Sequence, residues 1–511
     1  MPPVSSPANP LVARIGLAAG PVLAVMVGSG PWWGFTLDAS LAPAGQQQLN
    51  SMAAVAVLMA VWWLTEAVPM AVTALMPLVY FPTLGIMPAK AIAAEYGHPV
   101  IFLFLGGFLI ALAVEESGLH RRVALWIVSI MGDQPRRVVF GFMLGTAVLS
   151  MWISNTATVM LMLPIAVSVL AQSDAQGGDP NEQRKFNVAL LLGIAYAASI
   201  GGMGTLIGTP PNVAFRAIYG NEFPVHDAAT PEISFFRWML MALPFALIFL
   251  VVAWWLLTRV IFRLPDGSLL GGRDVIGEQR RELGPVSKAE FRTAVVFVIT
   301  ALLWVFREPL TGTGLYRGGY VKDGTVAMLM AVMCFIIPSG SKPNAALLEW
   351  QSVRRVPWGL LILFGGGLAL ARGMEYTGLD VYLGQRLAVT LRSLPDVGKM
   401  AVTALGMTSL TELTSNTASV NMISPVLARS AQDLQVPPLM LMLPATLAAS
   451  CAFMLPVATP PNAIVYGSGR LRIYDMIKAG LWLNLIGVVL VVLAVLVFGV
   501  LAFGKAAIFA G

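Results

Sequence analysis

Charged residues are scarce in this chain. Of its 511 residues only 11% are Asp, Glu, Lys or Arg, whereas 57% are hydrophobic. A soluble protein of this length would need far more charge to cover its domains in water. The composition therefore excludes a water-soluble multidomain protein, and it predicts that most of the chain lies in a lipid bilayer.

Cysteine and histidine are also rare. The two cysteines, Cys334 and Cys451, lie inside apolar runs, where isolated thiols pack as small hydrophobic side chains. The three histidines, His98, His120 and His226, are far apart in the sequence. These positions argue against a disulfide framework, a histidine metal cluster and a histidine proton relay. Because no nucleophile has a histidine base nearby at membrane depth, we do not expect an enzyme.

Basic residues are present but do not form a cluster. The chain has a formal charge of +6 from 32 Lys and Arg against 26 Asp and Glu. The basic residues stand singly or in pairs between apolar segments, with no basic stripe, so a nucleic-acid partner is not expected. This arrangement is typical of charges that flank membrane-spanning segments.

Long apolar segments fill most of the sequence. Crossing a bilayer as a helix takes about 20 apolar residues. Eleven segments are predicted to cross: 11–30, 51–66, 69–86, 99–116, 187–218, 235–261, 293–306, 324–338, 357–374, 438–467 and 477–503. The first is interpreted as a transmembrane helix and not as a cleaved signal peptide.

Two further apolar stretches, 138–171 and 397–430, do not fit a simple crossing. Each would extend about 51 Å as one helix, and each has a polar cluster at its middle. Folded at that cluster, its two arms would each be about 21 to 25 Å long, too short to cross. A single tilted helix with Ser and Thr bonded to its own carbonyls is the alternative. Since the feature occurs twice, we predict two re-entrant helical hairpins.

The chain contains an internal repeat. Ser-Asn-Thr-Ala occurs at 154–157 and at 415–418, and Thr-Pro-Pro-Asn occurs at 209–212 and at 459–462, in the same order. Five predicted crossings separate the two Ser-Asn-Thr clusters, and an odd number turns the second copy upside down. Inverted repeats with broken helices are typical of secondary transporters. A duplicated scaffold without transport is the less favoured alternative.

The repeated motifs suit binding of anions and cations. Two consecutive prolines must break a helix, which frees carbonyls for a cation and presents a positive helix end to an anion. The Ser-Asn-Thr clusters supply neutral hydroxyl and amide groups, and no Lys or Arg lies beside them. Bound sodium would provide the missing positive charge. Glu412 is the one acid in this set, and we interpret it as a carboxylate satisfied by helix ends and hydroxyls, not as a proton or cation site.

The paired Ser-Asn-Thr clusters, each followed by a Pro-Pro-Asn break, closely resemble the divalent anion/sodium symporter family, which includes Na⁺/dicarboxylate and Na⁺/citrate carriers. The resemblance covers nearly the whole chain. It implies a homodimeric, multi-pass protein of the bacterial inner (plasma) membrane, all α-helical, with two re-entrant hairpins and two discontinuous helices. Each protomer would have a static scaffold and a mobile transport domain that moves as an elevator. The expected divisions are scaffold helices at 1–135, a first transport half at 136–262, a cytoplasmic loop and scaffold helices at 263–375, and a second transport half at 376–511.

The resemblance also implies a set of site residues. The substrate carboxylates would be held at Asn155, Thr156, Asn416 and Thr417, with Thr209, Pro210, Thr459 and Pro460 from the breaks. A first sodium ion would bind Ser150, Ser154, Asn155 and the carbonyl of Gly208. A second would bind Thr411, Asn416 and the carbonyls of Thr414 and Ala458.

The predicted function is sodium-driven uptake of a C4-dicarboxylate such as succinate, malate or fumarate. A sodium-independent exchanger of dicarboxylates or citrate is the main alternative, because such exchangers have similar motifs. Sulfate is a weaker candidate, since a tetrahedral oxyanion does not need two separated grips. A channel is also less favoured, because inverted discontinuous helices are typical of alternating access.

Overall fold

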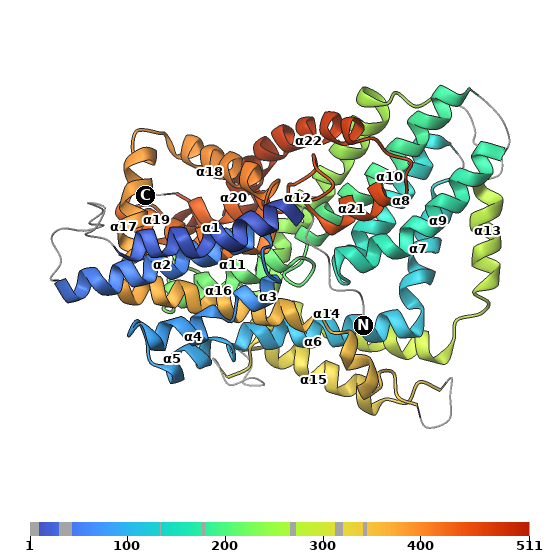
Figure 1. Ribbon diagram of the computed structural model, residues 1–511. Helices are drawn as coiled ribbons and strands as arrows, with labels where there is room; N and C mark the ends of the chain where they lie inside the picture. Colours follow the sequence, from blue (N-terminus) through green and yellow to red (C-terminus); the bar gives the residue numbers. More distant parts are fainter. Residues whose placement is uncertain are drawn as a thin grey trace.

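The computed structural model is all α-helical, as predicted (Figure 1). It describes residues 10–29, 43–132, 134–175, 179–265, 272–311, 320–340 and 345–509. Within those ranges the extended pairing is a single isolated bridge between Pro338 and Ala346. The helices therefore carry the whole architecture.

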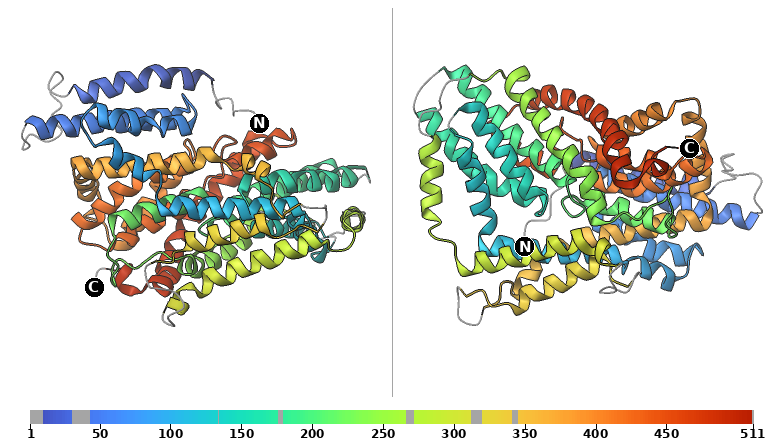
Figure 2. Two further views of the ribbon diagram at one scale, coloured as in Figure 1. Left: turned by 90° about the horizontal axis from the view of Figure 1, so that it is seen from below. Right: turned by 180° about the vertical axis from the view of Figure 1, so that it is seen from behind.

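The helices of the first half begin with an antiparallel pair that lies along one side of the molecule (Figure 2). Their bounds are α1 Pro10–Gly28, α2 Pro43–Thr65, α3 Met70–Thr73, α4 Met76–Thr83, α5 Ala89–Glu95, α6 Pro99–Ser117, α7 Leu119–Ile130, α8 Pro135–Ser150, α9 Asn155–Ala175, α10 Pro180–Met203, α11 Pro210–Glu222 and α12 Phe235–Trp255. A π-helical segment, η2 Leu256–Ile261, continues α12.

The second half contains the remaining helices. Their bounds are α13 Gly272–Glu282, α14 Lys288–Thr311, α15 Asp323–Ile336, η3 Trp350–Arg355, α16 Trp358–Thr377, α17 Leu379–Leu391, α18 Asp396–Thr411, α19 Asn416–Asp433, α20 Pro438–Ala448, α21 Pro460–Gly467, α22 Ile473–Ala494, η4 Val495–Gly499, α23 Val500–Phe503 and η5 Lys505–Ala507.

Eight of the described helical segments are long and apolar enough to cross a membrane, and three shorter helices are also apolar. A multi-pass membrane protein is thereby confirmed. The number of crossings stays a prediction, because several predicted segments are interrupted. Segment 69–86 divides into α3 and α4, and segments 187–218 and 438–467 divide at their Pro-Pro pairs.

The two anomalous stretches each form two helices joined by a short turn. In the first, the chain reverses between α8 and α9, because Met162 lies beside Gly145 although the two are far apart in sequence. Both α8 and α9 pack against α10, and both α18 and α19 pack against α20. One arm is longer than predicted, since α9 has 21 residues and is long enough to cross. The re-entrant path therefore stays a prediction.

We call α8 to α11 the first copy and α18 to α21 the second copy. The copies interlock: α11 packs against α19, and α21 packs against α9 and α10. Each helix that follows a break is thus held by the other copy's hairpin. Helix α10 lies at the centre, and 94% of its most apolar stretch is buried.

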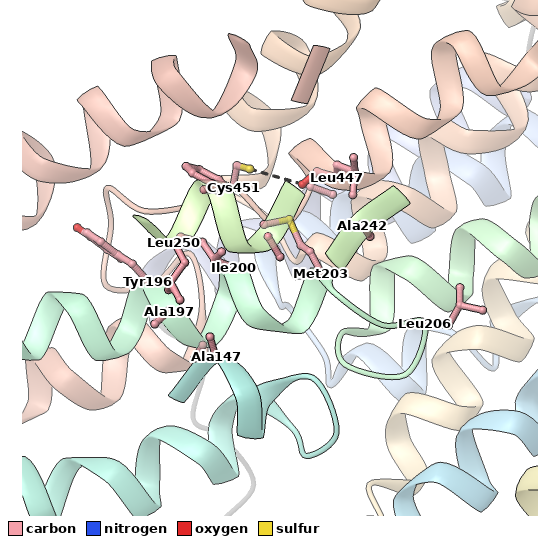
Figure 3. Close-up of a cluster of buried hydrophobic side chains, with 14 of the residues drawn as sticks. Ala147, Tyr196, Ala197, Ile200, Met203, Leu206, Ala242, Leu250, Leu447 and Cys451 are labelled. Carbon is pink, nitrogen blue, oxygen red and sulfur yellow. Dashed lines mark hydrogen bonds between the residues drawn. The ribbon is translucent and has the colours of Figure 1, made fainter. Parts of the chain in front are cut away.

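The core around α10 is apolar and closely packed (Figure 3). Tyr196 and Met203 of α10 lie there with Leu447 and Cys451 of the second copy. The Cys451 thiol donates to the Leu447 carbonyl at 3.5 Å. Both cysteines of the chain are free and buried, so their role in this structure is packing.

Helices α7 and α17, like α5 and α13, lie outside the predicted segments, because their sequences are too polar to be recognised as membrane segments. Both α7 and α17 follow a glycine with positive φ, Gly118 at 81° and Gly378 at 76°, which ends the preceding apolar helix. Helix α7 buries one face through Ala124, Leu125 and Val128 and exposes the other. The pair Gly-Leu occurs at 118–119 and again at 378–379, about the same distance before each Ser-Asn-Thr motif, so the two glycines end α6 and α16 at equivalent places.

A buried ion network fastens the first break helix in place. Asp323, at the start of α15, is fully buried and accepts from Arg307 Nε at 2.6 Å. Its other oxygen lies 2.8 Å from the Arg216 guanidinium of α11. Two arginines around one desolvated carboxylate leave its charge compensated, whereas removal of one partner would be costly. The network ties α11 to α14 and α15.

Candidate functional site

The turn between α8 and α9 brings predicted site residues together. Ser150, the last residue of α8, is fully buried, and its hydroxyl donates to the Ala198 carbonyl at 2.7 Å. The same hydroxyl lies 2.6 Å from the amide of Asn155, the first residue of α9. In the amide orientation that satisfies its neighbours, Asn155 also donates to the Gly208 carbonyl at 3.2 Å. Ser150, Asn155 and Gly208 therefore form one oxygen-rich cluster.

The second copy repeats this arrangement. The Thr411 hydroxyl donates to the Ala449 carbonyl at 2.9 Å and lies 2.5 Å from Asn416 Oδ1. Thr411 ends α18 and Asn416 begins α19, as Ser150 and Asn155 end α8 and begin α9. The duplicated sequence thus produces a duplicated cluster of hydroxyl, amide and backbone oxygens.

Both helices break where the Pro-Pro pairs predict. Thr209 (φ −141°, ψ 140°) and Thr459 (φ −143°, ψ 148°) are extended, because proline disfavours helical geometry in the residue before it. Helices α11 and α21 then begin at Pro210 and Pro460. Proline suits this first helical position, where the missing N–H would have no partner within the helix.

The asparagine after each Pro-Pro pair holds its break in shape. Asn212 Nδ2 donates to the Thr205 carbonyl at 2.7 Å, and Asn462 Nδ2 donates to the Leu455 carbonyl at 3.0 Å. Both asparagines are fully buried. Each therefore supplies a donor to carbonyls that the interrupted helix leaves unpaired.

Gly202 permits the close approach of the first hairpin to the first break. A Cβ atom at Gly202 would lie 2.7 Å from the side-chain amide of Asn155 and 3.2 Å from the Gly208 carbonyl oxygen. Any side chain there would push into the oxygen cluster. The second copy has Ala452 at the corresponding position, so the same restriction does not apply to it.

Glu412 lies beside the second turn and is buried, at 6% exposed. Its Oε1 accepts from the backbone N–H groups of Phe453 at 2.8 Å and Met454 at 2.9 Å, and from Asn484 Nδ2 at 2.6 Å. Its Oε2 accepts from Leu455 N–H at 3.2 Å. The carboxylate is fully hydrogen-bonded, but its donors are the backbone N–H groups of the non-helical segment 453–455 and an amide of α22, in place of the predicted helix ends and hydroxyls.

The other predicted residues lie at or next to these clusters. Thr156 is half-buried and Thr417 is buried, each in the first turn of its helix. The Ser154 hydroxyl accepts from Ala157 N–H at 3.2 Å and so caps α9. The Thr414 hydroxyl lies 2.5 Å from Ser419 Oγ and donates to the Leu410 carbonyl, and Ala458 is buried in the second break.

Two backbone carbonyls of the clusters were missed by sequence reasoning. The Ala198 and Ala449 carbonyls accept from the Ser150 and Thr411 hydroxyls. No side-chain signal could have identified them, because every residue carries a carbonyl and only the fold selects which one faces the turn.

The arrangement suits a hard monovalent cation together with an anion. Hydroxyl, amide and carbonyl oxygens are the ligands that such cations prefer. Four helices, α9, α11, α19 and α21, begin at the turns and breaks, and helix N-termini attract negative charge. Within the described part of the chain, His, Cys, Asp and Glu form no group of three that would hold a metal ion.

Comparisons with known proteins agree with this geometry. Residues 41–504 match the family model described as the sodium:sulfate symporter transmembrane region. The sodium-dependent dicarboxylate transporter SdcS of Staphylococcus saprophyticus is 42% identical over 446 residues, which cover 86% of this chain and 84% of that protein. SdcS of Staphylococcus aureus is 41% identical over the same shares. Among solved structures, the YdaH transporter of Alcanivorax borkumensis has the same fold, with a TM-score of 0.52 at 14% identity over 97% of this chain and 99% of that one. The resemblance to divalent anion/sodium symporters is confirmed, and this chain belongs to the sodium:sulfate symporter family.

Proposed function

We propose that this protein is a sodium-coupled symporter of C4-dicarboxylates, such as succinate, malate and fumarate, in the bacterial inner membrane. Its curated relatives at 41% and 42% identity are named sodium-dependent dicarboxylate transporters. Two separated positive helix ends match a ligand with two negative ends, which favours a dicarboxylate over sulfate.

The observation that carries the proposal is the duplicated oxygen cluster. Ser150 with Asn155, and Thr411 with Asn416, each gather neutral oxygens at the turn of a hairpin beside a broken helix. Neutral ligands bind sodium weakly enough to release it on the far side of a membrane. We assign the first sodium site to Ser150, Ser154, Asn155 and the Gly208 carbonyl, and the second to Thr411, Asn416 and the carbonyls of Thr414 and Ala458.

The dicarboxylate would lie between the two turns. Its carboxylates would accept hydrogen bonds from the hairpin residues and face the positive ends of the break helices. This assigns substrate binding to Asn155, Thr156, Asn416 and Thr417, with Thr209, Pro210, Thr459 and Pro460. The interlocked packing of α11 on α19 and of α21 on α9 supports a site shared by both copies.

An inverted-repeat elevator fits the same arrangement. We propose that 136–262 and 376–511 form the two halves of a mobile transport domain, and that 1–135 and 263–375 form a scaffold. The continuous packing between the copies supports their movement as one body. The Arg216–Asp323–Arg307 network joins α11 to the scaffold helices α14 and α15 in this conformation, so it would separate during that movement. A homodimer joined through the scaffolds would hold each scaffold still while its transport domain moves.

Uptake by reconstituted vesicles tests the proposal. Proteoliposomes with an inward sodium gradient should accumulate radiolabelled succinate, and vesicles with an equal potassium gradient should not. Excess unlabelled malate or fumarate should reduce uptake more than sulfate does. If uptake is equal without sodium and requires succinate inside the vesicle, the protein is an exchanger and not a symporter.

A further inference from the structure

The second break is organised by a buried carboxylate that the first break lacks. Glu412 accepts four hydrogen bonds, from the backbone N–H groups of Phe453, Met454 and Leu455 and from the Asn484 amide. All four donors are electrically neutral. Within this set of contacts, the carboxylate is therefore held by neutral hydrogen-bond donors and by no basic side chain.

The corresponding part of the first copy is built differently. There α10 stays helical through Met203, the counterpart of Phe453, whereas α20 ends at Ala448. Met151 occupies the place of Glu412 in the repeated sequence. Its backbone carbonyl, not its side chain, bonds the break, by accepting from the Thr205 hydroxyl at 2.5 Å.

The unwinding in the second copy changes which backbone carbonyl is available to the cation cluster. In a continued helix, the N–H of Phe453 would donate to the carbonyl of Ala449, four residues earlier. That N–H instead donates to Glu412, while the Ala449 carbonyl accepts from the Thr411 hydroxyl. A carbonyl released from its helix bond has a lone pair available to a cation. Glu412 directly follows Thr411, the last residue of α18, so the backbone links the carboxylate to the proposed cation cluster.

We propose that Glu412 is the positioning residue of the second cation site, which it forms by holding the backbone of 453–455 unwound. This inference rests on the proposed sodium coupling and deepens it: the two sodium sites are unequal, and only the second depends on a buried charge.

The test compares sodium dependence in purified full-length variants. Succinate binding is measured by calorimetry while sodium chloride replaces potassium chloride, and thermal unfolding is followed with sodium alone. Glu412→Gln loses the charge and, with its oxygen kept toward the three donors on Oε1, turns its NH2 toward the Leu455 N–H. The half-saturating sodium concentration should therefore rise about tenfold or more. Its affinity for succinate at saturating sodium should stay within about threefold of wild type. Glu412→Asp keeps a carboxylate, so its half-saturating sodium concentration should lie between those of wild type and Glu412→Gln.

A matched control is Glu290→Gln. Glu290 is another buried glutamate, in α14, that accepts from a backbone N–H, that of Ser287, and pairs with Arg122. This substitution should lower thermal stability without changing sodium dependence. The same pattern in Glu412→Gln, a lower unfolding temperature with unchanged half-saturating sodium, would reduce Glu412 to a structural role and overturn the inference.

A second variant keeps the inference testable if Glu412→Gln does not fold. Asn484→Ala removes one donor and leaves the carboxylate, so sodium binding should weaken by a smaller factor in the same direction. Unchanged sodium dependence in that variant also overturns the inference. A wild-type protein that binds succinate equally in potassium would contradict the proposed symport itself, which distinguishes the two failures.

Discussion

The two helix breaks share their sequence motif but differ in backbone path. Both have an extended threonine before Pro-Pro and an asparagine that bonds back across the gap. In the first break, α10 stays helical up to Met203. In the second break, α20 ends at Ala448, and the non-helical backbone that follows donates hydrogen bonds to Glu412. The motif therefore specifies that a helix breaks and that an asparagine bonds back across the gap. Neighbouring residues outside the motif decide how far the helix unwinds.

The largest effect is expected when the asparagine that begins α9 or α19 is replaced. Asn155→Ala and Asn416→Ala should each weaken sodium and succinate binding together, by roughly 100-fold, since each amide lies in a proposed cation site and begins a helix proposed to face the substrate. Calorimetric titration of succinate at a series of sodium concentrations measures both. If only one asparagine matters, the copies are not functionally equivalent, and if neither does, the site assignment is wrong.

A medium effect should separate the copies at one position. Gly202→Ala forces a methyl group to 2.7 Å from the side-chain amide of Asn155, and overpacking of this kind costs about 1–3 kcal/mol. We expect about tenfold weaker sodium binding in direct titrations. The reciprocal change Ala452→Gly adds space in the second copy and should alter sodium binding by less than about threefold. Equal effects would contradict the close approach seen only in the first copy.

The smallest effect concerns the hydroxyl that closes the first break. Thr205 donates to the Met151 carbonyl and accepts from Gly208 N–H at 3.0 Å. Thr205→Val should lower stability by about 1–2 kcal/mol, because the loss leaves buried groups unpaired. Leu455→Val is the matched control, since Leu455 contributes its backbone N–H to Glu412. Thermal unfolding in detergent measures both substitutions. Equal destabilisation would contradict the view that the first break is closed by the Thr205 side chain and the second by the backbone N–H of Leu455.

Much of the fold was predictable from hydropathy and the repeat. The breaks at Pro210 and Pro460 and the turns at Ser154 and Ser415 lie where the sequence places them, because proline and polar clusters at membrane depth leave few alternatives. Helices α7 and α17 were missed, since their apolar residues occupy one face only and do not raise the average hydropathy. The length of α9 was underestimated because its polar end, to Ala175, remains helical.

The site was predictable in its side chains but not in its backbone. Ser150 and Asn155 come together as the resemblance implied, and so do Thr411 and Asn416. The Ala198 and Ala449 carbonyls escaped prediction because a carbonyl leaves no trace in the residue type. The Arg216–Asp323–Arg307 network escaped it for a different reason, since its members are distant in sequence and pair only in the folded chain.

The interlocking of α11 with α19 and of α21 with α9 has a consequence for biosynthesis. A nascent chain emerges N-terminus first, so α9 and α11 leave the ribosome long before their partners exist. At about 5–20 residues per second, the wait for residues some 250 positions later is roughly 10 to 50 s. During that interval the first copy has its polar turn and broken helix in the membrane without the surfaces that bury them. Truncated chains that end before α18 should therefore be substrates for membrane quality control and not stable half-transporters.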